Sequence, residues 1–190
     1  MIADLSNLFL LGEDFIPGAV RADFTCDIAD IYKWVSGECT RTITLKQCEG
    51  EKLCDLIGTT ATLRLISKRV QEALISERIT GWRTCPIEFK DKKGELIDNY
   101  GALATVGRCG PLDNSRCRKI TRKALATDEL IDVFLGYYFD EDSWDGSDLF
   151  RPEGTRMTMV TQRAKDVIES ISATNIEFKP ILEIESLMLL

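Results

Sequence analysis

The chain has 190 residues, of which 44% are hydrophobic and 29% charged, a composition typical of a soluble globular protein with one sizeable core. Its formal net charge of -7 argues against a nucleic-acid partner, because nucleic acid is normally bound by a basic face. The sequence contains no histidine, which excludes Ser-His-Asp and Cys-His catalysis and histidine-ligated metals. We therefore expect a protein that is not an enzyme and that uses neither a metal nor a cofactor.

The cysteines and the chain ends indicate a cellular location. No two cysteines have the C-x-x-C spacing of a zinc or redox site, and we interpret all seven as reduced thiols, with a disulfide framework as the weaker alternative. The first residues lack the basic segment and apolar run of a signal peptide. The apolar runs at 8–11 and 187–190 are far shorter than the ~20 residues of a membrane span. These features predict a cytoplasmic protein without a membrane association.

Local patterns predict the first elements. The apolar run Leu8–Gly12 is typical of a short strand. Apolar residues at helical spacing predict a helix over 26–36 that ends near Gly37. Alternation and β-branched residues predict a half-exposed strand over 40–45, and residues 61–66 form another extended segment.

A helix–strand unit at about 66–89 recurs at about 160–184, 94 positions later and without a gap. Ser67 and Thr161 each supply a hydroxyl suited to the N-cap of the helix. Gly81 and Asn175 match after the helix, where these two residue types favour the left-handed conformation of a helix C′. The chain is thus predicted to use one structural unit twice.

Two further pairs match between the units. Arg69 and Arg163 lie in the first helical turn, where they are either solvated or bound to a carboxylate of the adjoining strand, fixing helix to sheet. Pro86 and Pro180 lie in the extended segments, and a proline there indicates an edge strand or a strand start. Both pairs are interpreted as structural.

Between the units, the turn signal at 91–94 predicts a hairpin, and a strand is expected over 100–106. Basic residues gather at 116–123, and a helix is expected to begin at 127–130, where acids fall in the first turn. Alternating strands and two helix–strand units predict a single α+β domain, residues 1–190, with helices packed on a mostly antiparallel sheet.

Residues 140–148 hold five acids and no base, with a tryptophan among them, and are predicted to form a loop. An aromatic side chain surrounded by charge is a common interface composition, so this acidic loop is the candidate partner-binding site. Its residues are Asp140, Glu141, Asp142, Trp144, Asp145 and Asp148. The alternatives are a solvated loop or one that pairs with the basic segment 116–123.

Several short motifs follow one another in a recognisable order. They are Ser67-x-Arg69, Gly81-Trp82 before Pro86, Asn99-Tyr100, Leu112-Asp113 with Ser115, Asp148-Leu149-Phe150-Arg151, and Thr161-x-Arg163. In these motifs the sequence resembles a family of bacterial proteins first catalogued as a domain of unknown function and later assigned as immunity proteins of polymorphic toxin systems. The resemblance covers about residues 55–185, which makes 55–190 an immunity-like core and 1–54 a variable N-terminal cap.

The resemblance implies a cytoplasmic protein that binds a cognate toxin and blocks it, and the family has no catalytic residues to transfer. If the toxin is a nuclease with a basic active site, the acidic loop would cover that site and speed association. One alternative is an adaptor or chaperone for a secreted effector. The other is a metal-dependent enzyme with Asp140, Asp142 and Asp148 as oxygen ligands, although calcium-loop spacing is absent because Trp144 occupies a ligand position.

Overall fold

The computed structural model describes residues 4–25, 27, 29–39, 41–124 and 128–186. These residues form three α-helices: α1 (Ile31–Val35), α2 (Lys68–Ser76) and α3 (Gln162–Ser170). Short 3-10 turns follow the chain at η1 (Leu5–Asn7), η2 (Asn114–Arg116), η3 (Glu141–Ser143) and η4 (Ile181–Glu183). The remaining regular structure is β-sheet, so the chain is mostly sheet.

The largest sheet has seven strands in the order β6-β8-β5-β4-β2-β3-β7. Their bounds are β2 (Arg21–Phe24), β3 (Ile43–Glu49), β4 (Leu56–Thr59), β5 (Arg64–Ser67), β6 (Trp82–Cys85), β7 (Ile87–Lys90) and β8 (Tyr100–Thr105). The two edge strands, β6 and β7, are consecutive in the chain and meet at Pro86, so one bent segment supplies both edges of a strongly curled sheet. Because proline has no N–H to donate, it is tolerated at such a bend.

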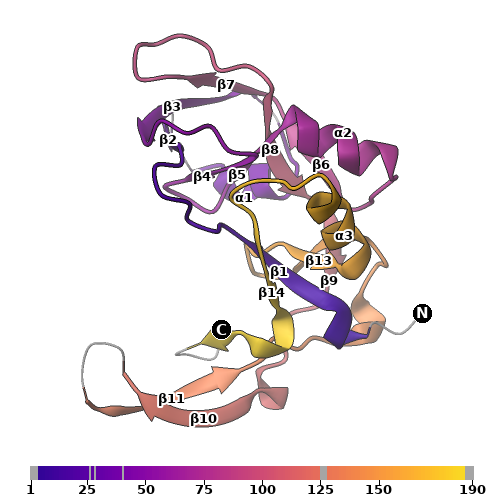
Figure 1. Ribbon diagram of the computed structural model, residues 1–190. Helices are drawn as coiled ribbons and strands as arrows, with labels where there is room; N and C mark the ends of the chain where they lie inside the picture. Colours follow the sequence, from indigo (N-terminus) through magenta and orange to yellow (C-terminus); the bar gives the residue numbers. More distant parts are fainter. Residues whose placement is uncertain (1–3, 26, 28, 40, 125–127, 187–190) are drawn as a thin grey trace.

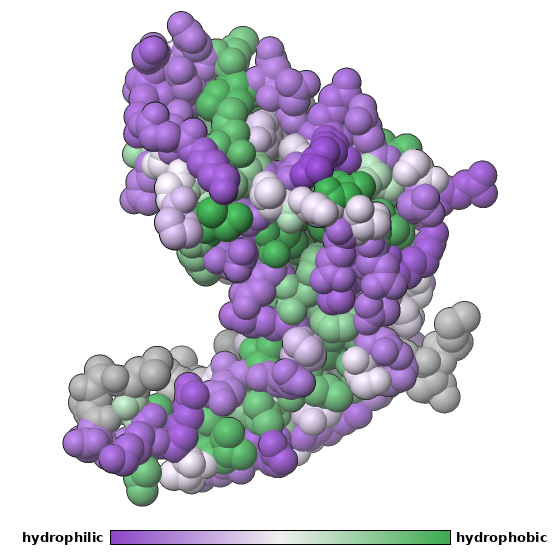
Figure 2. Space-filling view, viewed as in Figure 1, coloured by the Kyte–Doolittle hydropathy of each residue, from purple (hydrophilic) through white to green (hydrophobic). Residues whose placement is uncertain are grey.

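The second sheet has five strands in the order β14-β1-β13-β12-β9, and the third has three in the order β10-β11-β15. Their bounds are β1 (Leu8–Gly12), β9 (Gly107–Cys109), β10 (Arg118–Lys123), β11 (Leu130–Leu135), β12 (Leu149–Pro152), β13 (Met159–Thr161), β14 (Glu177–Pro180) and β15 (Glu185–Ser186). Figure 1 shows the third sheet as an arm that projects from the body. Figure 2 shows the molecule hollowed between this arm and the body.

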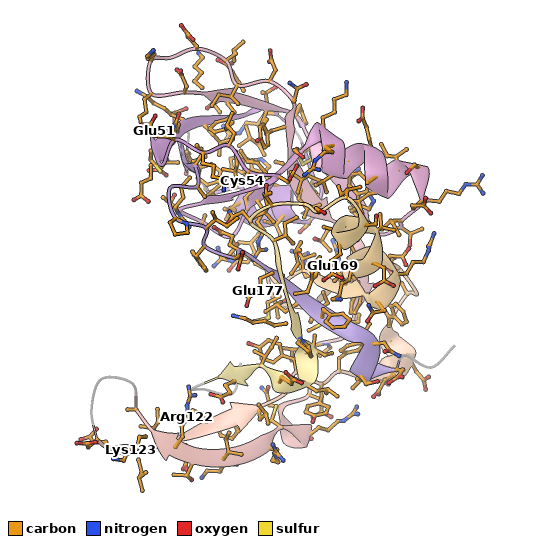
Figure 3. The ribbon with its side chains drawn as sticks, in the orientation of Figure 1. Glu51, Cys54, Arg122, Lys123, Glu169 and Glu177 are labelled. Carbon is orange, nitrogen blue, oxygen red and sulfur yellow. A yellow bond between two sulfur atoms is a disulfide. The ribbon has the colours of Figure 1, made fainter. Side chains whose placement is uncertain are left out.

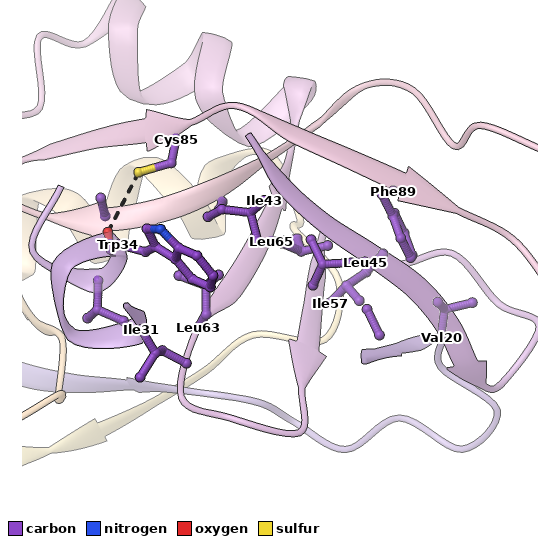
Figure 4. Packing of buried hydrophobic residues seen from close by; sticks show 14 residues of the cluster. Val20, Ile31, Trp34, Ile43, Leu45, Ile57, Leu63, Leu65, Cys85 and Phe89 are labelled. Carbon is purple, nitrogen blue, oxygen red and sulfur yellow. Dashed lines mark hydrogen bonds between the residues drawn. The ribbon is translucent and has the colours of Figure 1, made fainter. Parts of the chain in front are cut away.

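Three apolar clusters hold these sheets together. The first fills the inside of the curled sheet, where Trp34 of α1 is fully buried near Leu63 and Ile43, and Phe89 lies at the far end of the same cluster (Figure 4). The second lies beneath α2 and α3, and the third lies on the other side of the five-stranded sheet, around Phe139 and Phe150. The arm contributes little to these clusters, since only Val133 among the residues of β10 and β11 is buried.

Most predicted elements are confirmed. Strand Leu8–Gly12 has the predicted bounds, the 91–94 turn forms with Gly94 at a φ of 94°, and β8 covers most of 100–106. The mostly antiparallel sheet with packed helices is also confirmed, although helix is a smaller share of the chain than the α+β label suggests. Three strands from the first 54 residues belong to the two large sheets: β1 lies between β14 and β13, while β2 and β3 belong to the curled sheet.

Several predictions need correction. The helix predicted over 26–36 is observed only as Ile31–Val35, and residues 26 and 28 lie outside the described part of the chain. The strand predicted over 40–45 is shifted to Ile43–Glu49, and position 40 lies outside the described part. The helix predicted from 127–130 is wrong: Leu130 begins β11, which pairs antiparallel with β10, while residue 127 is not described. Pairing with a neighbouring strand here overrides the local acid signal.

The cysteine interpretation is wrong for one pair. Cys39 and Cys85 form a disulfide, with Cα atoms 5.4 Å apart, and Cys85 is 1% exposed inside the curled sheet beside Trp34 (Figure 4). Cys48, Cys54, Cys109 and Cys117 are free thiols. None of the helices in the described part of the chain has the length and apolar character needed to cross a bilayer.

Candidate functional site

The first cluster of converging polar side chains surrounds Asp55, which precedes β4. Its carboxylate accepts hydrogen bonds from the Ser67 hydroxyl (2.7 Å), from Nε (3.1 Å) and Nη2 of Arg69, and from the backbone N (2.8 Å) and hydroxyl (2.9 Å) of Thr174. The Asp55 side chain is 10% exposed and forms an ion pair with Arg69. We call this group the Asp55 cluster. It ties the start of α2 to the segment that follows α3.

The second cluster repeats this arrangement around Asp148, which precedes β12. Its carboxylate accepts from the Thr161 hydroxyl (3.1 Å), from Nη1 of Arg163 (3.0 Å), and from the backbone N and hydroxyl of Thr80 (3.0 Å each). The Asp148 side chain is 11% exposed. This group, the Asp148 cluster, ties the start of α3 to the segment that follows α2.

The two clusters exchange partners reciprocally between the repeat units. Arg69, in the first turn of α2, donates to the Ile171 carbonyl at the C-terminus of α3 (2.7 Å), and Arg163 of α3 donates to the Glu77 carbonyl at the C-terminus of α2. A cation is favourable there because the last carbonyls of a helix have no partner within the helix. Each unit therefore supplies hydrogen-bond partners to the other.

The structure confirms much of what was predicted for the repeat. The hydroxyls of Ser67 and Thr161 accept from the backbone N of Val70 and Ala164, as N-caps do. Arg69 and Arg163 each bind a carboxylate, so of the two alternatives stated for these arginines, solvation is not the one observed. Pro86 joins the two edge strands of the curled sheet, and Pro180 ends the edge strand β14, as predicted for prolines in strands.

The predicted helix stop needs a correction. Gly81 (φ 82°) and Asn175 (φ 61°) do adopt the left-handed conformation, but they lie beyond the helix ends. The C′ position next to each helix is filled by Arg78 (φ 52°) and Ser172 (φ 50°). Gly81 serves a different purpose: a Cβ atom there would lie 1.9 Å from the Leu149 carbonyl oxygen. Glycine is thus required where this turn touches β12.

The hydrogen bonds of the Asp55 cluster also determine the protonation state of the Asp55 carboxylate. Burial alone would raise the pKa of Asp55, but the hydrogen bonds from Arg69, Thr174 and Ser67 outweigh it and hold the pKa well below its ordinary value of 3.8. Asp55 is therefore ionised at neutral pH. Tyr100, whose hydroxyl donates to the Cys54 carbonyl (2.9 Å), has its pKa raised to about 12 by burial and by the nearby Asp55 charge.

In the acidic loop, most side chains are engaged within the chain. Glu141 forms a two-pronged ion pair with Arg116 (2.8 and 3.0 Å), and Arg116 holds the pKa of Glu141 below its ordinary range. Asp145 accepts from the backbone N of Arg108 (2.8 Å). Asp140 caps η3, and Asp148 lies in the Asp148 cluster. Pairing with the basic segment thus occurs, through Arg116.

Two residues complete the acidic loop. Trp144 is half-buried: its ring lies 5.3 Å from that of Phe150, and its N–H donates to the Ser147 carbonyl (3.2 Å). Asp142 is exposed, and its carboxylate makes no hydrogen bond or ion pair with the described residues. The three proposed metal ligands, Asp140, Asp142 and Asp148, are not gathered, and the described ranges contain no group of three acids or cysteines placed to hold an ion.

A cavity of about 540 Å³ lies elsewhere, and no sequence motif pointed to it. Arg64 lines it, and the Nε atom of Arg64 is buried without a hydrogen-bond partner. Asp55 was also not identified from the sequence as the counterpart of Asp148. The two residues are 93 positions apart, whereas the other matched residues of the repeat are 94 positions apart. A single-residue gap in the repeat alignment would have revealed it.

Comparison with protein-family models and with curated proteins found no match to this sequence.

Proposed function

We propose that this chain is an immunity protein, a non-catalytic protein of the cytoplasm that binds a cognate bacterial toxin and blocks it. The observation that carries the proposal is the position of the motifs behind the family resemblance. Ser67, Arg69, Asp148, Thr161 and Arg163 all belong to the Asp55 and Asp148 clusters, where they fasten one repeat unit to the other. Motifs that secure a fold are what a family of binding proteins would share while its surfaces diverge to match different toxins.

The remaining motif residues also have structural contacts. Asp113 caps η2 by accepting from the backbone N (3.0 Å) and hydroxyl (2.6 Å) of Ser115. Asn99 adopts a positive φ of 70° at the entry to β8, and Tyr100 bonds the Cys54 carbonyl. These contacts support a role in folding for each motif. We also class the fold as α+β, since α2 and α3, although short, cover the second apolar cluster and carry the reciprocal contacts.

Two surfaces are candidates for the toxin. The acidic loop keeps Asp142 exposed, but Glu141 and Asp148 are already neutralised by arginines and Trp144 packs inward. The second surface is the hollow between the arm and the body, beside Glu177 on β14 and with Arg122 and Lys123 on the arm (Figures 2 and 3). Leu130, on the arm, is 71% exposed, which is unusual for a large apolar side chain.

Co-expression tests the proposal. Cells that make the toxin encoded beside this chain should grow only when the chain is present, whereas an adaptor or chaperone would not restore growth. Binding to the purified toxin domain should then be measured by calorimetry. A stable one-to-one complex without rescue of growth would favour the adaptor, and no complex at all would refute both.

Single substitutions locate the surface. Asp142→Arg reverses a charge without disturbing a bond inside the loop, and Asp98→Arg, an exposed acid between β7 and β8, is its matched control. Leu130→Asp tests the arm. If the acidic loop is the contact, Asp142→Arg weakens binding by roughly tenfold or more while the other two variants bind normally. A loss confined to Leu130→Asp would place the contact on the arm instead.

The disulfide bears on the proposed location. Disulfides are rare in a reducing cytosol, so Cys39–Cys85 weighs against a cytoplasmic site of action. Trapping thiols with an alkylating reagent in intact cells, followed by mass spectrometry, measures the state of this pair directly. Free Cys39 and Cys85 would agree with the cytoplasm, and a fully formed bond would place the chain in an oxidising compartment.

A further inference from the structure

The cavity of about 540 Å³ lies where five segments of the chain meet. Its walls come from β1, from α1, from the residues that lead into β5, from the segment after β9 and from the turn at 153–157. Cavities of this size commonly hold small molecules, and they combine an apolar lining with a few polar groups. The lining here has that mixture: it includes Leu10, Leu112 and Met157 together with Arg64, Thr62 and Tyr32.

Arg64 is the unusual member of this lining. It lies on β5, opposite Gly58 of β4 and Leu103 of β8, and its neighbour on the same face, Ile66, is buried in the second apolar cluster. The Arg64 Nε atom is buried and has no hydrogen-bond partner. The exposed part of the side chain lines the cavity.

No carboxylate compensates this charge fully. Burial lowers the pKa of Arg64, and the charge of Glu13 opposes this shift without cancelling it. Glu13 is itself bonded to Arg21 at 3.0 Å and forms no ion pair with Arg64. Because an arginine remains protonated even when buried, the cavity wall carries a cation that forms no ion pair with the described residues. Such a charge destabilises the fold unless another group neutralises it.

A second cation lies near the first. The guanidinium of Arg156, which also lines the cavity, is stacked 4.5 Å from the centre of the Tyr32 ring. Tyr32 is 54% exposed, so this pair stands at an open side of the cavity. One acid, Glu153, belongs to the lining and is exposed to solvent. The cavity lining therefore combines positive charge with apolar side chains.

We propose that this cavity binds a small organic anion, whose carboxylate or phosphate pairs with Arg64 and whose apolar part lies against Leu10, Leu112 and Met157. The arginine fork matches the oxygen atoms of either head group, and the apolar walls exclude water from the pair. This site is separate from the acidic loop and from the arm. The proposal for this site does not depend on the proposal that the chain binds a toxin.

Calorimetry and thermal unfolding with three probes test the site: benzoate, phenyl phosphate and the neutral benzyl alcohol. At least one of the two anions should bind saturably and raise the Tm, and the alcohol should not. The stronger anion identifies the head group as carboxylate or phosphate. Inorganic phosphate, tested alone, shows whether the apolar part contributes.

Two variants decide the role of Arg64. Arg64→Met should weaken binding of the anion by roughly 10- to 100-fold and, without ligand, raise the Tm, because it removes an unpaired charge. Arg118→Met removes an exposed arginine on β10 and is the control for net charge. It should change neither the affinity for the anion nor the Tm. A structural arginine would instead show a lower Tm in Arg64→Met. That result, or the absence of saturable binding by both anions, would overturn the proposal.

Should Arg64→Met fail to fold, Leu112→Trp provides a second test. It adds bulk at another lining residue and leaves the charge in place, so it should abolish anion binding. Undiminished binding of the anions by a folded Leu112→Trp protein would place their site elsewhere and refute the assignment.

Discussion

Replacing Asp55 with Asn tests whether the reciprocal clusters hold the two repeat units together. The substitution preserves shape but removes the charge that accepts five hydrogen bonds from Ser67, Arg69 and Thr174. Breaking a buried ion pair by removing one partner typically costs about 3–5 kcal/mol. Because the Arg69 side chain is 50% exposed and remains hydrated, we expect the lower end, about 3 kcal/mol.

Urea unfolding followed by tryptophan fluorescence measures this loss, and thermal unfolding should show a Tm lower by roughly 6–12 °C. Asp98→Asn is the matched control, because Asp98 is exposed and its carboxylate bonds none of the described residues. Asp148→Asn should also destabilise the chain, by somewhat less than Asp55→Asn, since Asp148 accepts four such bonds and only one of them comes from its arginine. If Asp55→Asn were no less stable than the control, the clusters would not be what joins the units.

The same residue predicts a pH dependence. The folded-state pKa of Asp55 lies below its ordinary value of 3.8, so the unfolded chain takes up the proton first as the pH falls. The stabilisation by Asp55 is therefore complete well above pH 4 and declines as the pH drops from there toward the folded-state pKa. The difference in unfolding free energy between the natural chain and Asp55→Asn should shrink below about pH 4. A difference that stayed constant down to pH 3 would contradict the assignment.

Three further predictions concern other parts of the fold. Gly81→Ala should destabilise the chain by about 2–4 kcal/mol through its clash and positive φ, whereas Gly94→Ala, with a positive φ but open space, should cost less; equal losses would discount the clash. Ultraviolet titration should show one tyrosine ionising near pH 12, absent in Tyr100→Phe, and stability should fall above about pH 10 because the unfolded tyrosine loses its proton first. Reducing Cys39–Cys85 should cost about 2–4 kcal/mol, so an unchanged Tm under reductant would show that the bond adds no stability.

The sequence by itself determined the features that depend on neighbours a few positions away. The N-caps at Ser67 and Thr161 were predictable because a hydroxyl reaches a backbone N–H only three residues along. The apolar strand Leu8–Gly12 was predictable for the same reason, since its pattern lies within one segment. The recurrence of the helix–strand unit also required no knowledge of contacts.

Tertiary structure decided what those residues do. The sequence left Arg69 with two alternatives, because its carboxylate partner, Asp55, lies 14 residues upstream and its carbonyl partner, Ile171, lies 102 residues downstream. Pairing with β10 made a strand of Leu130, where the local acids favoured a helix. Pattern shows which segment a residue occupies, but only the packing of distant segments shows which groups meet.

The same reason applies to the disulfide and to Arg64. Cys39 and Cys85 are 46 positions apart, and nothing in their spacing foretold the bond between the segment after α1 and the end of β6. In the sequence Arg64 is an ordinary strand residue. Its Nε atom is buried without a hydrogen-bond partner at the wall of a cavity, while Glu13 pairs with Arg21, and only the fold brings these features together.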